Sequence, residues 1–353
     1  MKTSKLAAGA MALILPLTLC FTGCSFGFNS FSYQYENGDK YTAGNREIDD
    51  TITKINIDYV SGDVKVKGAD TDIVSVEETA NQTLDSDHQV HTWVDGDTLY
   101  VRYCVSTKRI SFNKIEKELE ITLPSDQELD NFIIEVSSGN IDLDGFTTDY
   151  LNSHASSGNI AIDCSATDIE IKSSSGNINL IQNGNSNSVK VKASSGNIGI
   201  NHDGNCNTFD IDSSSGKISI NQQGIIGMAK IHSSSGGVSA VMGTVDTLSI
   251  DVSSGGISLD ADEVKNLDTK ASSGHSEIIL DKVPETSNIN CSSGGIDVSI
   301  PEDSDVTVHT QISSGEFNYD LPFSKNGKDY INGNGTADMS IHCSSGDVNF
   351  HKV

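Results

Sequence analysis

The residue pair that most resembles a catalytic motif is Ser214 with Lys217. Their S-x-x-K spacing is the one with which penicillin-recognising enzymes activate a serine nucleophile. In those enzymes the serine opens a helix, whereas here the same corner reads Ser-Ser-Gly-Asn in earlier repeats, so Lys217 occupies a variable position. The chain contains no G-x-S-x-G, H-E-x-x-H or G-x-x-x-x-G-K-[ST] motif. The sequence therefore assigns no catalytic residue and predicts that the protein is not an enzyme.

The histidines are scattered through the chain. His154, His232 and His342 each stand four residues before a repeated glycine, at a position otherwise filled by Lys, Asp, Glu, Asn or Gln. No two of these three lie on consecutive repeats, which argues against a shared metal ion and favours solvated side chains. His88 and His91 are expected to face different ways. The sequence therefore assigns no metal ligand among the histidines.

Three groups of carboxylates fall in expected turns. They are Asp70 with Asp72; Asp260 with Asp262 and Glu263; and Glu302 with Asp303 and Asp305. Calcium sites gather carboxylates in loops, but none of these groups has the EF-hand or nonapeptide calcium-repeat spacing. Solvated charge is the favoured interpretation, and structural calcium is the one cofactor alternative.

Composition excludes two classes of protein. The 353 residues carry 49 Asp+Glu against 23 Lys+Arg, a net charge of −26, which would repel a phosphate backbone, so no nucleic-acid partner is expected. Only 36% of residues are hydrophobic, 32 are glycine, and no long stretch has helical periodicity. A large α/β enzyme is therefore not expected.

The amino terminus has the features of an export signal. Lys2 and Lys5 precede an apolar run, and Phe21-Thr22-Gly23-Cys24 resembles the bacterial lipobox. We expect residues 1–23 to be a lipoprotein signal peptide and Cys24 to be lipidated, which anchors the chain to the extracytoplasmic face of a bacterial membrane. Residues 24–50 are rich in Ser, Asn, Gly and Tyr and are expected to form a flexible tether.

The cysteines after Cys24 are not expected to form a disulfide framework. They are Cys104, Cys164, Cys206, Cys291 and Cys343. An odd number with wide spacing and no C-x-x-C predicts neither disulfides nor a zinc site. We expect Cys291 and Cys343 to be buried small hydrophobic residues.

An internal repeat dominates residues 131–353. A Ser-Ser-Gly tripeptide recurs, mostly 18–21 residues apart with a final gap of 31, and a related Val60–Val64 stretch lies upstream. Its glycines, the predicted structural corners, are Gly139, Gly158, Gly176, Gly196, Gly216, Gly236, Gly255, Gly274, Gly294, Gly315 and Gly346. Residues two and four positions after each glycine are mostly apolar, with a small or polar residue between them, as in a strand with one buried face.

Stacking these units predicts an all-β fold, a parallel β-solenoid (β-helix) with coils of about 18–21 residues. Glycine suits the corner because a sharp turn there favours positive φ or a small side chain. Asn140, Asn159, Asn177 and Asn197 follow four corners, where their amides are expected to hydrogen-bond along the stack.

The ends of the predicted solenoid are irregular. Residues 51–130 are expected to form a strand-rich amino-terminal cap with an early coil, including a hairpin that turns at Asp95-Gly96-Asp97. Pro322–Gly335 is expected to be a loop inserted before the last coil. Because the chain stops soon after Phe350, the last coil is expected to leave an edge that needs cover from that loop or from a partner.

The V/I-S-S-G-N-I/D-x-L coils, preceded by Glu120-Ile121-Thr122-Leu123-Pro124, resemble the bacterial putative-adhesin β-strand-repeat family, a domain of unknown function. The resemblance covers about residues 50–353 and implies surface adhesion or envelope scaffolding, with no catalytic residues. A more distant likeness is to envelope-stress lipoproteins that sense antimicrobial peptides.

The predicted function is a non-enzymatic, membrane-anchored surface lipoprotein, an adhesin-like or envelope interaction scaffold whose partner is a surface protein or a glycan. One alternative is an envelope-stress sensor that attracts cationic peptides through its negative charge. Another is a polysaccharide lyase or hydrolase on a β-helix. Against that enzyme, residues from Asn131 onward contain no arginine, and their outward positions show no repeated carboxylate pair or aromatic sugar platform.

Overall fold

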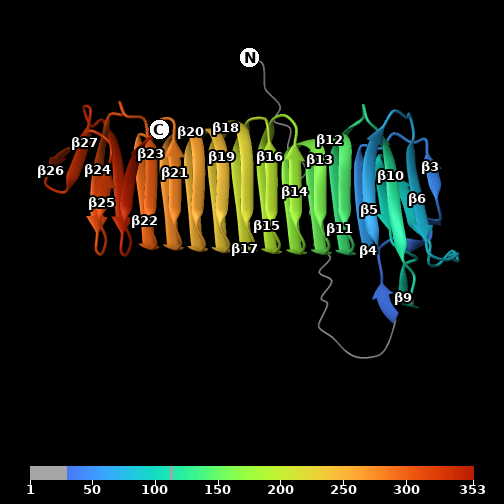
Figure 1. Cartoon of the computed structure of the whole chain (residues 1–353). Coiled ribbons are helices and arrows are strands. Elements are labelled where there is room, and N and C mark those ends of the chain that lie inside the picture. The colour runs from blue at the N-terminus through green and yellow to red at the C-terminus, as the bar shows by residue number, and fades with distance from the viewer. Residues whose placement is uncertain (1–29, 112–113) are drawn as a thin grey trace, which may run out of the picture.

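The computed structural model describes residues 30–111 and 114–353, which form one elongated stack of β-strands (Figure 1). The predicted signal peptide and Cys24 lie outside the described residues. In the described part of the chain, no helix is long and apolar enough to cross a membrane.

Each coil contributes one strand segment before its corner glycine and one after it. Equivalent segments of neighbouring coils pair in parallel and in register, as Ile178 pairs with Ile198 and Ile198 with Ile218. We call the two resulting layers the pre-glycine sheet and the post-glycine sheet. The predicted parallel β-solenoid is thus confirmed.

The coil strands are β4 (Lys54–Ser61), β5 (Asp63–Ala69), β11 (Glu128–Ser138), β12 (Ile141–Ser157), β13 (Ile160–Ser175), β14 (Ile178–Gln182), β15 (Ser186–Ser195), β16 (Ile198–His202), β17 (Cys206–Ser215), β18 (Ile218–Ser235), β19 (Val238–Ser254), β20 (Ile257–Ser273), β21 (Ser276–Leu280), β22 (Thr286–Ser293), β23 (Ile296–Ile300), β24 (Val306–Ile312), β25 (Phe317–Tyr319), β28 (Ala337–Cys343) and β29 (Val348–Lys352). The remaining elements are β1 (Ser30–Tyr33), a 3-10 helix η1 (Gly38–Lys40), β2 (Thr42–Ala43), β3 (Arg46–Ile48), β6 (Val74–Ala80), β7 (His91–Asp95), β8 (Thr98–Arg102), β9 (Thr107–Ser111), β10 (Lys117–Pro124), β26 (Ser324–Asn326) and β27 (Asp329–Asn332).

The core is a set of apolar columns between the two sheets. Alternate residues along each strand point inward, so that Ile160, Ile178, Ile198 and Ile218 are at most 1% exposed. The five described cysteines are buried and free, and burial raises the pKa of the Cys164 thiol to about 12. Such thiols pack as small apolar groups.

The corner glycines form a close backbone column. All eleven have φ between 118° and 147°, and a Cβ added at any of them would lie 1.9–2.5 Å from a carbonyl oxygen of the glycine in the neighbouring coil. Both the backbone conformation and the close approach therefore require glycine.

The asparagines beside the corners form the predicted ladder. The backbone N–H of Asn159 donates to Oδ1 of Asn140 at 2.9 Å, and Asn177, Asn197 and Lys217 repeat this bond, each to the asparagine one coil earlier. Each side chain thus satisfies a corner N–H that the strand pairing would leave without a partner.

The carboxy-terminal coil lies inside the stack rather than at its end. Strands β28 and β29 pair with β22 and β23 on one side and with β24 and β25 on the other. Cys291 and Cys343 are consequently in-register neighbours. The expectation that the last coil leaves an edge needing cover was wrong, because β24–β25 flanks that coil, and β27 in turn pairs antiparallel with β24.

The amino-terminal end has the same arrangement. The early coil β4–β5 lies between β11–β12 on one side and β8 with β10 on the other, although β8 and β10 come later in the sequence than β4 and β5. Antiparallel strands β7 and β6 then cover β8 and β10.

Residues 24–50 were predicted to form a flexible tether, but the described part of that range contains regular secondary structure. Residues 30–48 contain β1, η1, β2 and β3; of these strands, β2 and β3 pair with the cap strands β7 and β6, and β1 pairs with β9. Tyr33 is 3% exposed, and its hydroxyl donates to the Asp58 carbonyl at 2.8 Å. The burial of this ring and the strand pairing hold the segment against the cap.

Candidate functional site

An aromatic cleft of about 370 Å³ lies on the outer surface of the cap. It opens between the segment around η1 and the outward faces of β7, β8, β4 and β11. Its lining residues are Tyr35, Glu36, Asn37, Tyr41, Asn56, Ile57, Asp58, Trp93, Asp95, Tyr100, Arg102, Ile133 and Glu135. We call this the cap cleft.

Strand register brings the floor of the cap cleft together. Asp58 of β4 is the in-register neighbour of both Arg102 on β8 and Glu135 on β11. Two carboxylates and one guanidinium therefore stand in one row on three adjacent strands, although they lie far apart in the sequence.

The aromatic rings form a connected wall. Trp93 and Tyr100 are cross-strand partners whose rings stack at 5.3 Å with planes 19° apart. Tyr41 lies 5.6 Å from Trp93 and 4.7 Å from Tyr35, between ring centroids. The Lys40 ammonium lies 4.7 Å from the centre of the Trp93 ring. Four aromatic residues from three segments thus share one surface.

Arg102 is fixed within this wall. Its Nη1 donates to the carbonyls of Asn56 and Val101, both at 3.0 Å, and its guanidinium carbon lies 5.4–5.9 Å from the ring centres of Tyr35, Tyr41 and Tyr100. A guanidinium carries five N–H donors, so this one retains donors beyond these two bonds.

Asp58 is the carboxylate most affected by the cleft. Burial raises the pKa of Asp58, Arg102 opposes that rise, and Glu135 adds to it. The carboxylate is thus held in a partly dehydrated position, where a hydrogen bond from a ligand would be stronger than in water.

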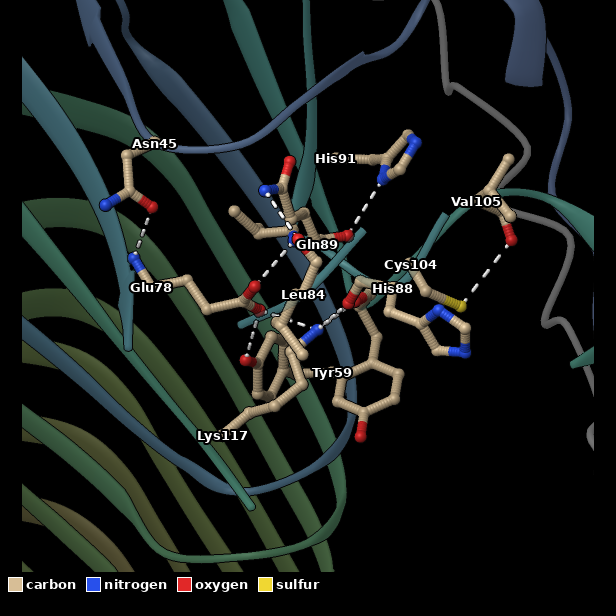
Figure 2. Close-up of polar contacts among 12 residues, drawn as sticks. Asn45, Tyr59, Glu78, Leu84, His88, Gln89, His91, Cys104, Val105 and Lys117 are labelled. Atoms are coloured by element: carbon tan, nitrogen blue, oxygen red, sulfur yellow. Dashed lines mark hydrogen bonds and ion pairs between the residues drawn. The ribbon is translucent and has the colours of Figure 1, made fainter. Parts of the chain in front are cut away.

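A buried ion pair, Lys117 with Glu78, lies inside the cap (Figure 2). Nζ of Lys117 is 2.6 Å from Oε1 of Glu78, and the two side chains are 0% and 3% exposed. The ammonium also donates to the carbonyls of His88 and Tyr103, at 2.7 and 2.6 Å. Burial lowers the pKa of Lys117, against the opposing effect of Glu78. With three acceptors the ammonium is satisfied, so we assign the pair a structural role.

This ion pair holds the strands that build the cap cleft. The hydroxyl of Tyr59 donates to Glu78 at 2.8 Å, and Lys117 bonds the carbonyl of Tyr103. Tyr59 and Tyr103 point inward, so their neighbours Asp58 and Arg102 point outward into the cleft. The pair thus bonds the inward-facing neighbours of Asp58 and Arg102 on the inner side of the cleft floor.

The histidines and the S-x-x-K lysine considered in the sequence lie outside the cap cleft and do not converge. His154, His232 and His342 are half-buried on the outer face of the pre-glycine sheet, each on a different strand. His88 contacts Asp85, whereas His91 is buried at 5% exposure and contacts the Gln89 carbonyl at 2.9 Å. The backbone N–H of Lys217 belongs to the asparagine ladder.

The carboxylate groups also remain separate. Glu263 pairs with Lys282 at 2.7 Å, and Asp305 accepts the backbone N–H of Asn334 at 2.7 Å. Within residues 30–111 and 114–353, no three His, Cys, Asp or Glu side chains are close enough to hold a metal ion.

The sequence interpretation missed the cap cleft. Tyr33, Tyr35 and Tyr41 were a usable signal, because three tyrosines in nine residues are unusual for a solvated tether. The single tryptophan of the chain, Trp93, was a second signal. Tyr41 and Trp93 come together because β2 pairs with β7, and no local pattern predicts that pairing.

The chain matches the Toastrack DUF4097 family over residues 52–243 and again over 181–351, and it belongs to this family. The match confirms the resemblance to a strand-repeat domain of unknown function. Similar solved structures include a putative cell adhesion protein from Clostridium sporogenes ATCC 15579, with 10% identity, a TM-score of 0.19, and coverage of 89% of this chain and 100% of that one. Another is a putative adhesin from Bacteroides fragilis NCTC 9343, with 12% identity, a TM-score of 0.21, and coverage of 87% and 95%. No curated protein matches this chain.

Proposed function

We propose that this protein is a non-enzymatic, adhesin-like interaction scaffold, anchored to the extracytoplasmic face of a bacterial membrane through a lipid on Cys24. The observation that carries the proposal is the position of the cap cleft at one end of a continuously paired rod. A rod of in-register strands is stiff and presents a site at a set place, which suits a scaffold.

The chain length after Cys24 would keep the cap close to the anchor. Ser30, the first residue of β1, lies six positions after Cys24. An extended chain spans at most about 3.5 Å per residue, so the cap would lie within roughly 20 Å of a membrane that holds Cys24. The cap cleft would then lie near the membrane.

The outer surface of the rod suits contact rather than catalysis. In-register pairing places Glu135, His154, Lys172, Lys192 and Asp212 in one row across five strands of the pre-glycine sheet. Acidic and basic groups are mixed along this row, which is typical of a solvated contact face.

The experiment is a retention assay with residues 30–353, which keep η1 and β2 over the cap cleft. The immobilised protein is exposed to envelope extract, to host-matrix proteins and to cationic peptides, with and without calcium. We expect saturable retention of an envelope or matrix component. A chain that retains none of these materials would contradict the scaffold function.

A second candidate is a sensor of cationic peptides. It is favoured by the net charge of −26 and by the carboxylates of Glu36, Asp58, Asp95 and Glu135 in the cap cleft. Retention of peptides alone, lost as salt is raised, would favour this candidate over the scaffold, because long-range attraction between charges is screened by salt.

A further inference from the structure

We propose that the cap cleft is a saccharide-binding site, in which a sugar ring packs against the Trp93–Tyr100 pair. This inference rests on the proposed scaffold function and names the partner chemistry of its amino-terminal end.

The aromatic wall provides the apolar half of such a site. A sugar ring has a face of C–H groups that packs on an aromatic ring, while its hydroxyls need polar partners at the ring edge. Trp93 and Tyr100 stack as a pair, and Tyr41 meets Trp93 at an angle of 58° between planes. Trp93 and Tyr100 thus form a platform, and Tyr41 forms a wall beside it. A bound sugar ring would contact the platform with one face and Tyr41 with one edge.

The polar residues provide the other half. Asp58 and Glu135 are acceptors on adjacent strands, and Arg102 offers donors beside them. A polyhydroxylated ring both donates and accepts hydrogen bonds, so it can use the guanidinium and the carboxylates together. A cation would use the carboxylates alone and would leave the Arg102 donors without a role in binding.

The size of the cap cleft agrees with this ligand. Ligand pockets commonly have volumes of about 300–1,000 Å³, and the cap cleft, at about 370 Å³, lies at the lower end. That volume suits a short segment of a glycan that continues into solvent. The expected position near the membrane makes a cell-wall glycan the first probe.

The test uses Trp93 as its own reporter, because it is the only tryptophan in the chain. The emission of Trp93 is followed while residues 30–353 are titrated with soluble cell-wall glycan fragments, chitotetraose, cellotetraose and laminaritetraose, and separately with choline and trilysine. We expect a saturable change with at least one saccharide and little change with either cation.

Matched variants locate the effect. Tyr100→Ala removes half of the stacked pair and should weaken saccharide binding by roughly tenfold or more, as truncation of a central aromatic contact does. Tyr319→Ala removes an aromatic residue that is 43% exposed at the opposite end of the rod and should leave binding unchanged. Circular dichroism of both variants checks that each still folds.

The outcomes separate this inference from the proposed function. No response to any saccharide probe, a response to the cations alone, or equal binding by Tyr100→Ala and the parent chain would each overturn the saccharide assignment. The scaffold function would survive these results if the immobilised chain still retained an envelope component. If the chain retained nothing from envelope or matrix yet Trp93 responded to a saccharide, the scaffold would fail and the site would stand.

Discussion

At both ends of the rod the coils stack in an order that differs from their order in the sequence. The strands that cover the outermost coil, however, differ between the two ends. At each end the terminal Ser-Gly coil, β4–β5 or β28–β29, lies inside the stack, covered by strands from nearer the middle of the chain. A coil whose strands pair on both sides is held more firmly than a coil at the end of a stack, whose strands pair on one side only. Both termini of the repeat are thereby protected.

The outermost layers differ in chemistry. At the amino-terminal end, β6 and β7 extend both sheets, and Lys117 of β10 forms a buried ion pair with Glu78 of β6. At the carboxy-terminal end, β27 covers only the pre-glycine sheet, and Phe317 packs on Tyr330 at 4.3 Å and on Phe350 at 5.5 Å. A polar anchor holds one end and an aromatic cluster the other, so the ends should respond differently to substitution.

The largest effect should come from the shared core between the ends. Replacing both Ile178 and Ile198 by Asp would put two unpaired charges into neighbouring coils at positions that are 1% exposed. Each buried charge costs several kcal/mol, so we expect the rod to lose its cooperative structure and both ends to unfold. Thermal unfolding followed by circular dichroism tests this; an unchanged melting curve would refute the stacked core.

The second effect should be confined to the amino-terminal end. Lys117→Met leaves the Glu78 carboxylate buried without its cation, and we expect a loss of about 3–5 kcal/mol in the free energy of unfolding of the cap. Chemical denaturation, with Trp93 emission as the probe of the cap, measures it. Lys172→Met is the matched control: its ion pair with Glu170 has the lysine side chain 47% exposed and should contribute about 0–1 kcal/mol.

A double variant separates charge from packing. In Lys117→Met with Glu78→Leu no charge is left buried, and stability should recover in large part, since an apolar pair can replace a buried ion pair. If the double variant were as unstable as Lys117→Met alone, the specific hydrogen bonds to Tyr59 and Val90 would matter more than the charge.

A smaller effect is expected at the carboxy-terminal end. Gly346→Ala would place a Cβ 1.9 Å from the carbonyl oxygen of Gly294 at a φ of 139°, and we expect a loss of about 1–3 kcal/mol. Gly327→Ala in the β26–β27 turn also has positive φ, but its Cβ would meet nothing within 4 Å. Hydrogen exchange of β28 and β29 should rise in the first variant only. Equal effects of the two would mean that backbone conformation alone, and not stacking, requires glycine at the corner.

The smallest effect concerns acid stability of the cap. The hydrogen bond from Lys54 to Asp97, with a second from Thr53, lowers the pKa of Asp97 to about 2. Because this pKa is lower in the folded chain than in the unfolded one, the contribution is present above the ordinary Asp range and is lost as the pH falls toward 2. Asp97→Asn should therefore reduce stability at neutral pH slightly and flatten the acid side of the unfolding profile of the cap; an unchanged profile would contradict it.

Much of the fold was predictable because it is local. The alternation around Gly176, Gly196 and Gly216 predicts strand, corner and strand, and the buried columns at Ile178 and Ile198 follow from it. The asparagine ladder was predictable as well, because equal spacing from each corner places the amides in one column. The cap cleft was not predictable in this way, since Tyr41, Trp93 and Arg102 share no repeat position.

The sequence by itself determined the coil: its length, its inward face and its glycine corner, since each depends on residues within about twenty positions of one another. Only the tertiary structure decided the order in which coils stack and the position of the cap cleft. The physical reason is that the coils have nearly identical edges, so backbone pairing alone barely distinguishes one neighbour from another. Non-repeating contacts, such as Lys117 with Glu78 and Phe317 with Tyr330, select the order, and these contacts join segments that no local pattern connects.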